Sequence, residues 1–127
     1  MVSDPEHVRR ARQYLDSREE RRRTQCRQLH VQAVHDFQAI LDMIIRQFHP
    51  DRVYQWGSVL RPECFRDYSD IDIAVEGITL PEAFFDMLGK AQAMTDFPVD
   101  IVQLEKVEQE FAEGIRKEGK IVYERQA

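Results

Sequence analysis

Three aspartates, Asp70, Asp72 and Asp100, are the residues whose type and spacing suggest chemistry. Asp70 and Asp72 lie two residues apart at the start of the apolar segment 71–75, which predicts a strand. Residues two apart on a strand point to the same face, so we expect the two carboxylates side by side, roughly 7 Å apart. Burying two like charges is costly unless a cation compensates them, and magnesium prefers oxygen ligands. The pair therefore predicts a divalent metal site.

Asp100 begins another apolar segment, 99–103, and a neighbouring strand would bring it beside the pair. Three converging carboxylates suit a two-metal site, in which metals about 4 Å apart hold the attacking and leaving oxygens of a phosphoryl displacement. Gly57 and Ser58 end an earlier predicted strand, 53–56, where glycine lets backbone N–H groups approach phosphate oxygens closely. Each feature alone is usually a turn, a solvated edge or a strand cap. Together they predict phosphoryl-transfer chemistry.

A long helix is expected before these residues. Between residues 33 and 48 the apolar side chains recur at i, i+3, i+4 and i+7, which predicts one buried helix face. Asp4 and Pro5 form a helix-start signal, and 6–32 lacks proline and glycine, so we expect helix through most of it. The sequence does not decide whether this helix breaks near Asp16.

Further elements follow the aspartate pair. The sequence predicts a helix from Leu80 to about residue 94, a helix over 106–117 with Gly119 as its C-cap, and a closing strand over 121–123. The whole order is α-β-β-α-β-α-β. It predicts an α/β (α+β) fold, with helices packed on one small mixed sheet.

Composition limits the class of protein. With 127 residues, 43% of them apolar and 32% charged, the chain has the makeup of a folded globular domain. Its two cysteines, Cys26 and Cys64, are far apart, which argues against a disulfide framework or a zinc site and favours a reducing cytoplasm. No segment approaches the roughly 18 apolar residues of a membrane helix. The sequence divides into a basic N-terminal helical extension, 1–32, and a catalytic domain, 33–127.

Charge is distributed unevenly between the two parts. Residues 1–30 carry eight Arg and five acidic residues, a net +3, whereas the remainder carries ten basic and eighteen acidic residues, a net -8. A catalytic part this acidic repels a phosphate backbone, so nucleic acid is not expected as the main partner. The mixed-sign run 18–23 is typical of a solvated, ion-paired helix face, with docking or homo- or hetero-oligomer contacts as the alternative.

Three motifs carry a resemblance to a known family: WGSVLR at 56–61, YSDIDIAV at 68–75 and PVDIV at 98–102. Together they resemble the minimal nucleotidyltransferases of the DNA polymerase β superfamily, which in bacteria are often paired with HEPN-domain proteins. The resemblance spans about residues 33–124, because 115–123 is similar to the family's closing helix, glycine and strand. It implies the polymerase-β-like nucleotidyltransferase fold.

The resemblance also implies roles for the candidate residues. Asp70 and Asp72 would bind two Mg²⁺ ions, and Asp100 would complete the catalytic-metal site and help deprotonate the acceptor hydroxyl. Gly57 and Ser58 would hold the triphosphate of ATP. The implied reaction is attack of a hydroxyl on the α-phosphorus, with transfer of AMP and release of pyrophosphate.

The loop after Ser58 departs from the family pattern. Pro62 stands where the family commonly has glycine, and the connector from Ser58 to Asp70 is slightly longer. Arg61 is a candidate phosphate contact, with a solvated loop arginine as the alternative. The aromatic residues Tyr54 and Trp56 are interpreted as packing residues rather than base-stacking ones.

Three functions remain open at this point. The first is transfer of AMP from ATP to a protein partner, which by resemblance is a tyrosine of a HEPN ribonuclease toxin, so that the chain acts as an antitoxin. The second is a non-catalytic antitoxin that neutralises its partner by forming a complex, using the N-terminal helix for docking. The third is nucleotidylation of a small hydroxylated molecule, which ranks lower because no second domain is apparent to enclose it.

Overall fold

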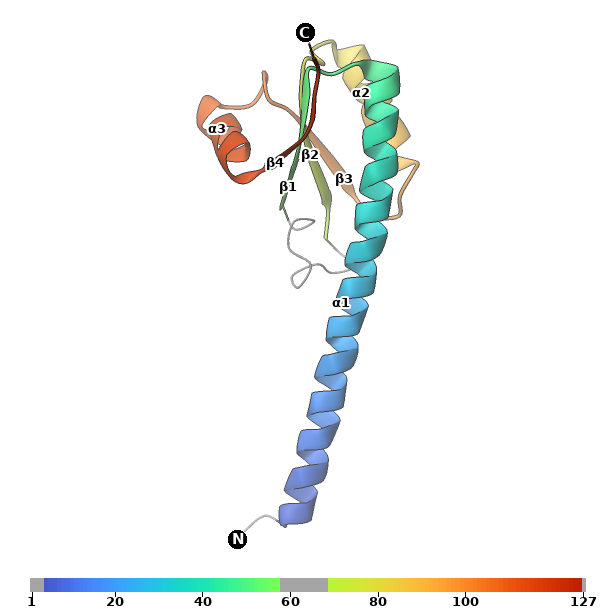
Figure 1. Cartoon of the computed structure of the whole chain (residues 1–127), viewed down its shortest axis with the longest axis vertical. Coiled ribbons are helices and arrows are strands. Elements are labelled where there is room, and N and C mark those ends of the chain that lie inside the picture. Colours follow the sequence, from blue (N-terminus) through green and yellow to red (C-terminus); the bar gives the residue numbers. More distant parts are fainter. Residues whose placement is uncertain (1–3, 58–68, 127) are drawn as a thin grey trace.

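A computed structural model describes residues 4–57 and 69–126 of the chain (Figure 1). It is a mixed α/β structure in which three helices pack on one four-stranded sheet. The element order is the predicted one. The elements are α1 (Pro5–Phe48), β1 (Arg52–Trp56), β2 (Ile71–Glu76), α2 (Pro81–Gln92), β3 (Val99–Gln103), α3 (Gln109–Glu118) and β4 (Lys120–Glu124).

The sheet has the strand order β3-β2-β1-β4. Strand β1 pairs antiparallel with both β2 and β4, whereas β2 and β3 run parallel, so the sheet is mixed as predicted. A register shift between Val53 and Tyr54 interrupts the β1–β4 pairing. Helix α3 begins three residues later than the predicted residue 106, because the backbone of 104–107 forms a turn instead.

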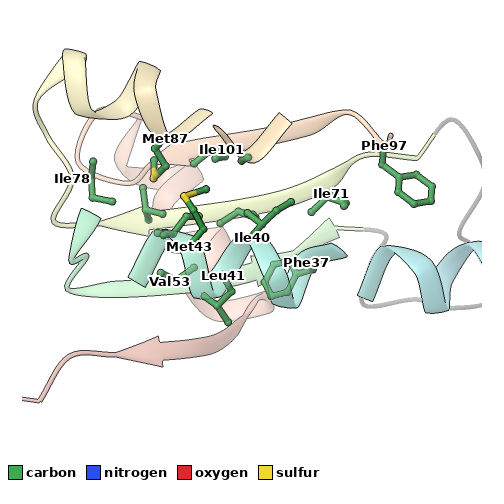
Figure 2. Packing of buried hydrophobic residues seen from close by; sticks show 14 of the residues in the cluster. Phe37, Ile40, Leu41, Met43, Val53, Ile71, Ile78, Met87, Phe97 and Ile101 are labelled. Atoms are coloured by element: carbon green, nitrogen blue, oxygen red, sulfur yellow. The ribbon is translucent and has the colours of Figure 1, made fainter. Parts of the chain in front are cut away.

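One face of the sheet lies under α1 and α2 and forms the main core (Figure 2). Alternate side chains of β2 point into it, and Ile71, Ile73 and Val75 are all fully buried, as the strand alternation predicted. From α1, Phe37 and Ile40 reach the same layer. Burial of each such side chain contributes about 1.5–3 kcal/mol to folding. Because this face buries more side chains than the opposite face, it supplies most of the apolar stabilisation.

The opposite face carries a smaller cluster under α3. The buried residues of this cluster are Tyr54, Ala74, Leu104, Ala112 and Ile115. Polar ties supplement it: Arg116 on α3 donates from Nε to Glu76 Oε1 of β2 at 2.9 Å, and Arg52 of β1 lies 3.8 Å from the same carboxylate. Helix α3 therefore packs on this face over β1 and β2, and Arg116 reaches from it to Glu76.

The turn from α3 into β4 depends on Gly119. The residue caps the helix as predicted, but with extended φ −78° and ψ 174° rather than in the left-handed conformation. Glycine is needed here because there is no space for a side chain. A Cβ there would lie 2.6 Å from the carbonyl oxygen of Ile115 and 3.1 Å from that of Gln55. Close approach of α3 to β1 thus explains the glycine.

Helix α1 is continuous over 44 residues, about 66 Å, and does not break near Asp16. Asp4 caps it, because its Oδ1 accepts a hydrogen bond from the backbone N–H of Glu6 at 3.0 Å. Every residue from 4 to 25 is exposed, and Cys26 is the first buried one. We call residues 5–25 the arm; it projects away from the sheet (Figure 1).

Among the residues that the structure describes, no helix is long and apolar enough to cross a membrane.

Candidate active site

The candidate residues lie at the end of the sheet where β1 finishes and β2 and β3 begin. Trp56, the last residue of β1, pairs with Asp72 of β2, and Asp72 pairs in turn with Asp100 of β3. Side chains paired across neighbouring strands share a face, so Asp72 and Asp100 are adjacent on the face that carries α3. Asp70 lies immediately before β2, two residues from Asp72. The topology thus brings together three aspartates separated by up to 30 positions.

The electrostatics of this cluster centre on Asp72. Its side chain is partly buried, whereas Asp70 and Asp100 are exposed. Burial, followed by the charge of Asp100 and then that of Asp70, raises the pKa of the Asp72 carboxyl from 3.8 to about 7. Among the described residues, no basic side chain forms an ion pair with any of the three. The cluster therefore has an excess of negative charge that a bound cation would offset.

Gly57 lies directly against Asp72. Its φ is +79°, a left-handed value that favours glycine, and a Cβ at this position would overlap Oδ2 of Asp72 and lie 2.9 Å from its Cγ. A side chain is therefore excluded here for two independent reasons. The other two residues predicted to bind the nucleotide, Ser58 and Arg61, lie outside the described part of the chain.

The three aspartates fit magnesium by their chemistry. They offer only carboxylate oxygens, the ligands that this ion prefers. As the side chains stand, however, no group of three or more His, Cys, Asp or Glu residues within 4–57 and 69–126 converges closely enough to hold an ion. Asp70 and Asp100 are exposed, so their side chains are free to reorient toward a bound ion.

The backbone entering β3 is held by Gln92, the last residue of α2. Its Nε2 donates to the carbonyl of Phe97 at 2.8 Å, and its Oε1 accepts from the N–H of Val99 at 2.9 Å. The N–H of Ile71 donates to the carbonyl of Pro98 at 2.8 Å. These bonds fix the start of β3, and hence the backbone of Asp100, against β2. The role of Gln92 is not predictable from the sequence, because a polar residue at a helix end carries no distinctive pattern.

A pocket of about 540 Å³ lies beside Gly57, between the end of β1 and α3. Its lining residues are Trp56, Gly57, Glu110, Phe111, Gly114, Ile115, Glu118 and Gly119. The rings of Trp56 and Phe111 meet edge to face, with centroids 5.7 Å apart. Tyr54 is buried, as predicted for a packing residue. The pocket was not predicted, because it arises from the placement of α3 over the sheet.

A family model described as "Polymerase beta, Nucleotidyltransferase" matches residues 38–127 of the chain. No protein with a curated description matches it significantly. The arm lies outside the matched residues.

Several solved structures of toxin–antitoxin complexes are similar to the chain. One, crystallised with AMP-PNP, is 27% identical with a TM-score of 0.57, covering 69% of this chain and 73% of the other. Another, the Shewanella oneidensis complex of a tri-AMPylated HEPN toxin with its MNT antitoxin, is 27% identical with a TM-score of 0.51, covering 70% and 73%. A MntA–HepT complex, at 23% identity, 72% coverage of each chain and a TM-score of 0.56, supports the fold alone.

Proposed function

This chain belongs to the polymerase β nucleotidyltransferase family, and on that premise we propose that it transfers AMP from ATP to a hydroxyl group of a protein partner. The observation that carries the proposal is the row formed by Gly57, Asp72 and Asp100, in which a turn with no room for a side chain lies against two paired carboxylates. Such a row suits a triphosphate held beside a metal-assisted displacement.

The similar structures support the proposed partner and nucleotide. One contains AMP-PNP, an ATP analogue, and another contains an AMPylated HEPN toxin with its antitoxin. We therefore propose that this chain is an antitoxin, that its partner is a HEPN toxin, and that a tyrosine of the toxin accepts AMP. We also propose that residues 33–127 form the catalytic domain and that residues 1–32 are a segment added to it.

Within the proposed mechanism, Asp70 and Asp72 would hold two Mg²⁺ ions, and Asp100 would complete the ligand set. Bound there, the ions would supply neutralisation of the charge that develops on the phosphoryl oxygens. Asp100 is exposed and accepts the proton of the incoming hydroxyl. Gly57, with Ser58 next to it in the sequence, gives the triphosphate backbone N–H donors without steric obstruction, and Arg61 adds a positive charge. Positioning and charge compensation account for most of the rate enhancement.

Label transfer tests this proposal. The full-length chain is incubated with ATP labelled at the α-phosphorus, Mg²⁺ and a HEPN-domain protein from the same genome, and the labelled residue is mapped by mass spectrometry. We expect label on a tyrosine of the partner, abolished by EDTA and reduced about 10³-fold or more by Asp72→Asn. Asp96→Asn, an exposed loop aspartate, is the matched control and should leave transfer intact. Undiminished transfer by Asp72→Asn would refute the assigned role of the carboxylate.

Two observations favour a second candidate, a non-catalytic antitoxin that neutralises its partner by complex formation. The described side chains do not converge on an ion as they stand, and the arm provides a surface outside the family match. A double variant, Asp70→Asn with Asp72→Asn, separates the two. If cells carrying the toxin are fully protected by this variant, complex formation suffices; if protection is lost while the variant still folds, AMP transfer is required.

A further inference from the structure

The arm exposes apolar side chains that no other described residue of the chain covers. Tyr14 is 60% exposed and Leu15 is 58% exposed. Val8, which is 45% exposed, lies seven residues (two helical turns) before Leu15 on the same face. Leu15 is flanked on the same helix face by Arg12 three residues before it and by Arg18 three residues after it. Neither arginine forms an ion pair within the described residues, unlike neighbours such as Arg10, which pairs with Glu6. The arm thus presents a leucine between two unpaired positive charges.

The pocket beside α3 presents the complementary pattern. Its apolar lining is partly accessible to solvent, because Phe111, whose ring meets that of Trp56, is 46% exposed. Gly114 lies in the middle of this helix face, and a Cβ there would meet nothing within 4 Å. Glu110 and Glu118 lie four residues on either side of Gly114, on the same stripe. Neither glutamate has an ion pair among the described residues. The pocket therefore presents a gap between two negative charges.

The spacings of the two patterns differ by about 3 Å, which long side chains can bridge. Arg12 and Arg18 are about 9 Å apart along the helix axis, and Glu110 and Glu118 are about 12 Å apart. Long arginine side chains span the difference. A leucine inserted above a glycine lets two helices approach closely, as in ridge-into-groove packing. Leu15 over Gly114 would place both arginines opposite both glutamates at once.

The arm of one molecule does not reach its own pocket. Helix α1 packs on the face of the sheet opposite to α3, and it is one unbroken helix that carries the arm away from the sheet (Figure 1). Folding the arm back would need a break that the helix does not contain. Any occupant of the pocket that matches the arm must therefore come from another molecule.

We propose that the chain forms a two-fold dimer in which the arm of each copy docks into the α3 pocket of the other. A two-fold operator makes the exchange reciprocal, so each leucine-in-pocket contact and its charge pairs occur twice. The basic arm and the acidic domain, +3 and -8 over residues 1–30 and 31–127, attract one another across the interface. Because the pocket includes Gly57, the docked arm borders the candidate active site of its partner. This inference does not depend on which reaction that site performs.

Sedimentation equilibrium of the full-length chain over a range of concentrations tests the dimer. We expect the mass of two chains, with the dimer weakening as salt rises because exposed charge pairs are screened. Leu15→Glu and Gly114→Leu should each raise the dimer Kd about tenfold or more, the first by placing a charge in the pocket and the second by filling it. Val31→Glu is the matched control: it is on the same helix and 67% exposed, and it should leave the dimer unchanged.

Charge reversal provides the most specific test of the proposed contact. One variant carries Arg12→Glu with Arg18→Glu, and the other carries Glu110→Arg with Glu118→Arg. Each alone should be monomeric, whereas an equal mixture should form a heterodimer in which both contacts have opposite charges again. Circular dichroism confirms that each variant keeps its helix content.

Three outcomes would overturn the proposal. The wild-type chain could sediment as a monomer throughout, the dimer could be insensitive to Leu15→Glu and Gly114→Leu, or the mixed charge-reversal variants could fail to associate. If the wild-type chain is monomeric and the arm variants instead lose binding to the HEPN-domain protein, the arm docks on that protein and not on a second copy.

Discussion

The face of the sheet under α1 and α2 and the face under α3 are made by alternate residues of the same strands. In β2, Ile71, Ile73 and Val75 enter a continuous apolar core, whereas Asp72 on the other side has a raised pKa and two acidic neighbours. The first face is covered by α1 and α2. The second is covered by α3 alone and leaves Asp100 exposed. One face stabilises the fold, and the charge that the other face concentrates lowers that stability.

Among substitutions outside the carboxylates themselves, the largest effect on transfer should come from filling the space beside Asp72. Gly57→Ala forces a Cβ onto the carboxylate and imposes a disfavoured φ, so we expect nucleotidyl transfer to fall about 10²-fold or more while the core stays folded. Initial rates measured with labelled ATP show the loss. Gly89→Ala is the control, since a Cβ at Gly89 meets nothing within 4 Å. Equal rates for both variants would mean that the contact between Gly57 and Asp72 has no role in catalysis.

On the apolar face, Ile73→Ala should act on stability instead. Removing this fully buried side chain leaves a cavity, and we expect the free energy of unfolding to fall by about 2–5 kcal/mol. Urea denaturation measures the change. Ile121→Ala, at a side chain that is 51% exposed, should change it by less than about 0.5 kcal/mol. Similar losses at the two positions would contradict the assignment of the core to the α1–α2 face.

The pH dependence of stability should reveal the strain on the charged face. Because the pKa of Asp72 is about 7 in the folded chain and 3.8 when unperturbed, the unfolded chain loses this proton first. The stability that Asp72 contributes therefore falls as pH rises from about 4 to about 7. We expect Asp72→Asn to raise the Tm by roughly 3–6 °C at pH 8 and to leave it unchanged at pH 4.

Asp96→Asn is again the control for this effect, and magnesium provides a second readout. Added Mg²⁺ should raise the Tm of the wild-type chain at pH 8, and the rise should be smaller in Asp72→Asn, since the ion binds only the folded carboxylate cluster. A gain in Tm for Asp72→Asn that is the same at pH 4 and pH 8 would show that the charge of Asp72 is not its source.

The smallest change in stability should come from the ion pairs that Glu76 makes with Arg116 of α3 and with Arg52. Glu76→Gln removes the charge that Arg116 and Arg52 share, and because both arginines are partly exposed we expect a loss of only about 1 kcal/mol. Denaturation in low and high salt measures it, and the loss should shrink in high salt. Glu82→Gln, at an exposed position on α2 with no ion pair in the described residues, is the control. A loss that is independent of salt would indicate packing rather than charge.

Much of the fold was predictable because its signals are local. The alternation in β2, the helix periodicity of 33–48 and the capping by Asp4 all depend on near neighbours in sequence, and all are confirmed. The adjacency of Asp72 and Asp100 followed once both were placed on strands. The unbroken helix through Asp16 could not be predicted, because a long polar helix and two shorter ones have the same composition.

The remaining features depend on contacts between distant segments. Gly119 looked like an ordinary C-cap, yet the carbonyl of Gln55 explains it, and Gln92 holds the entry to β3 through bonds that no periodicity indicates. The pocket beside Gly57 exists only because α3 crosses the sheet opposite to α1. Ser58, Arg61 and Pro62 lie outside the described residues, so their predicted roles stay predictions.

The continuity of α1 has a consequence for how the arm is kept helical. Starting a helix is costly, whereas extending one adds a hydrogen bond for each residue fixed, so an isolated segment of this length would be only marginally ordered in water. Here the half of α1 that packs on the sheet provides the nucleus, and the arm needs only propagation from it. Its order should therefore decline gradually toward Pro5, with amide hydrogens exchanging progressively faster along the arm. The sheet core thus acts as a template for a segment that it does not touch.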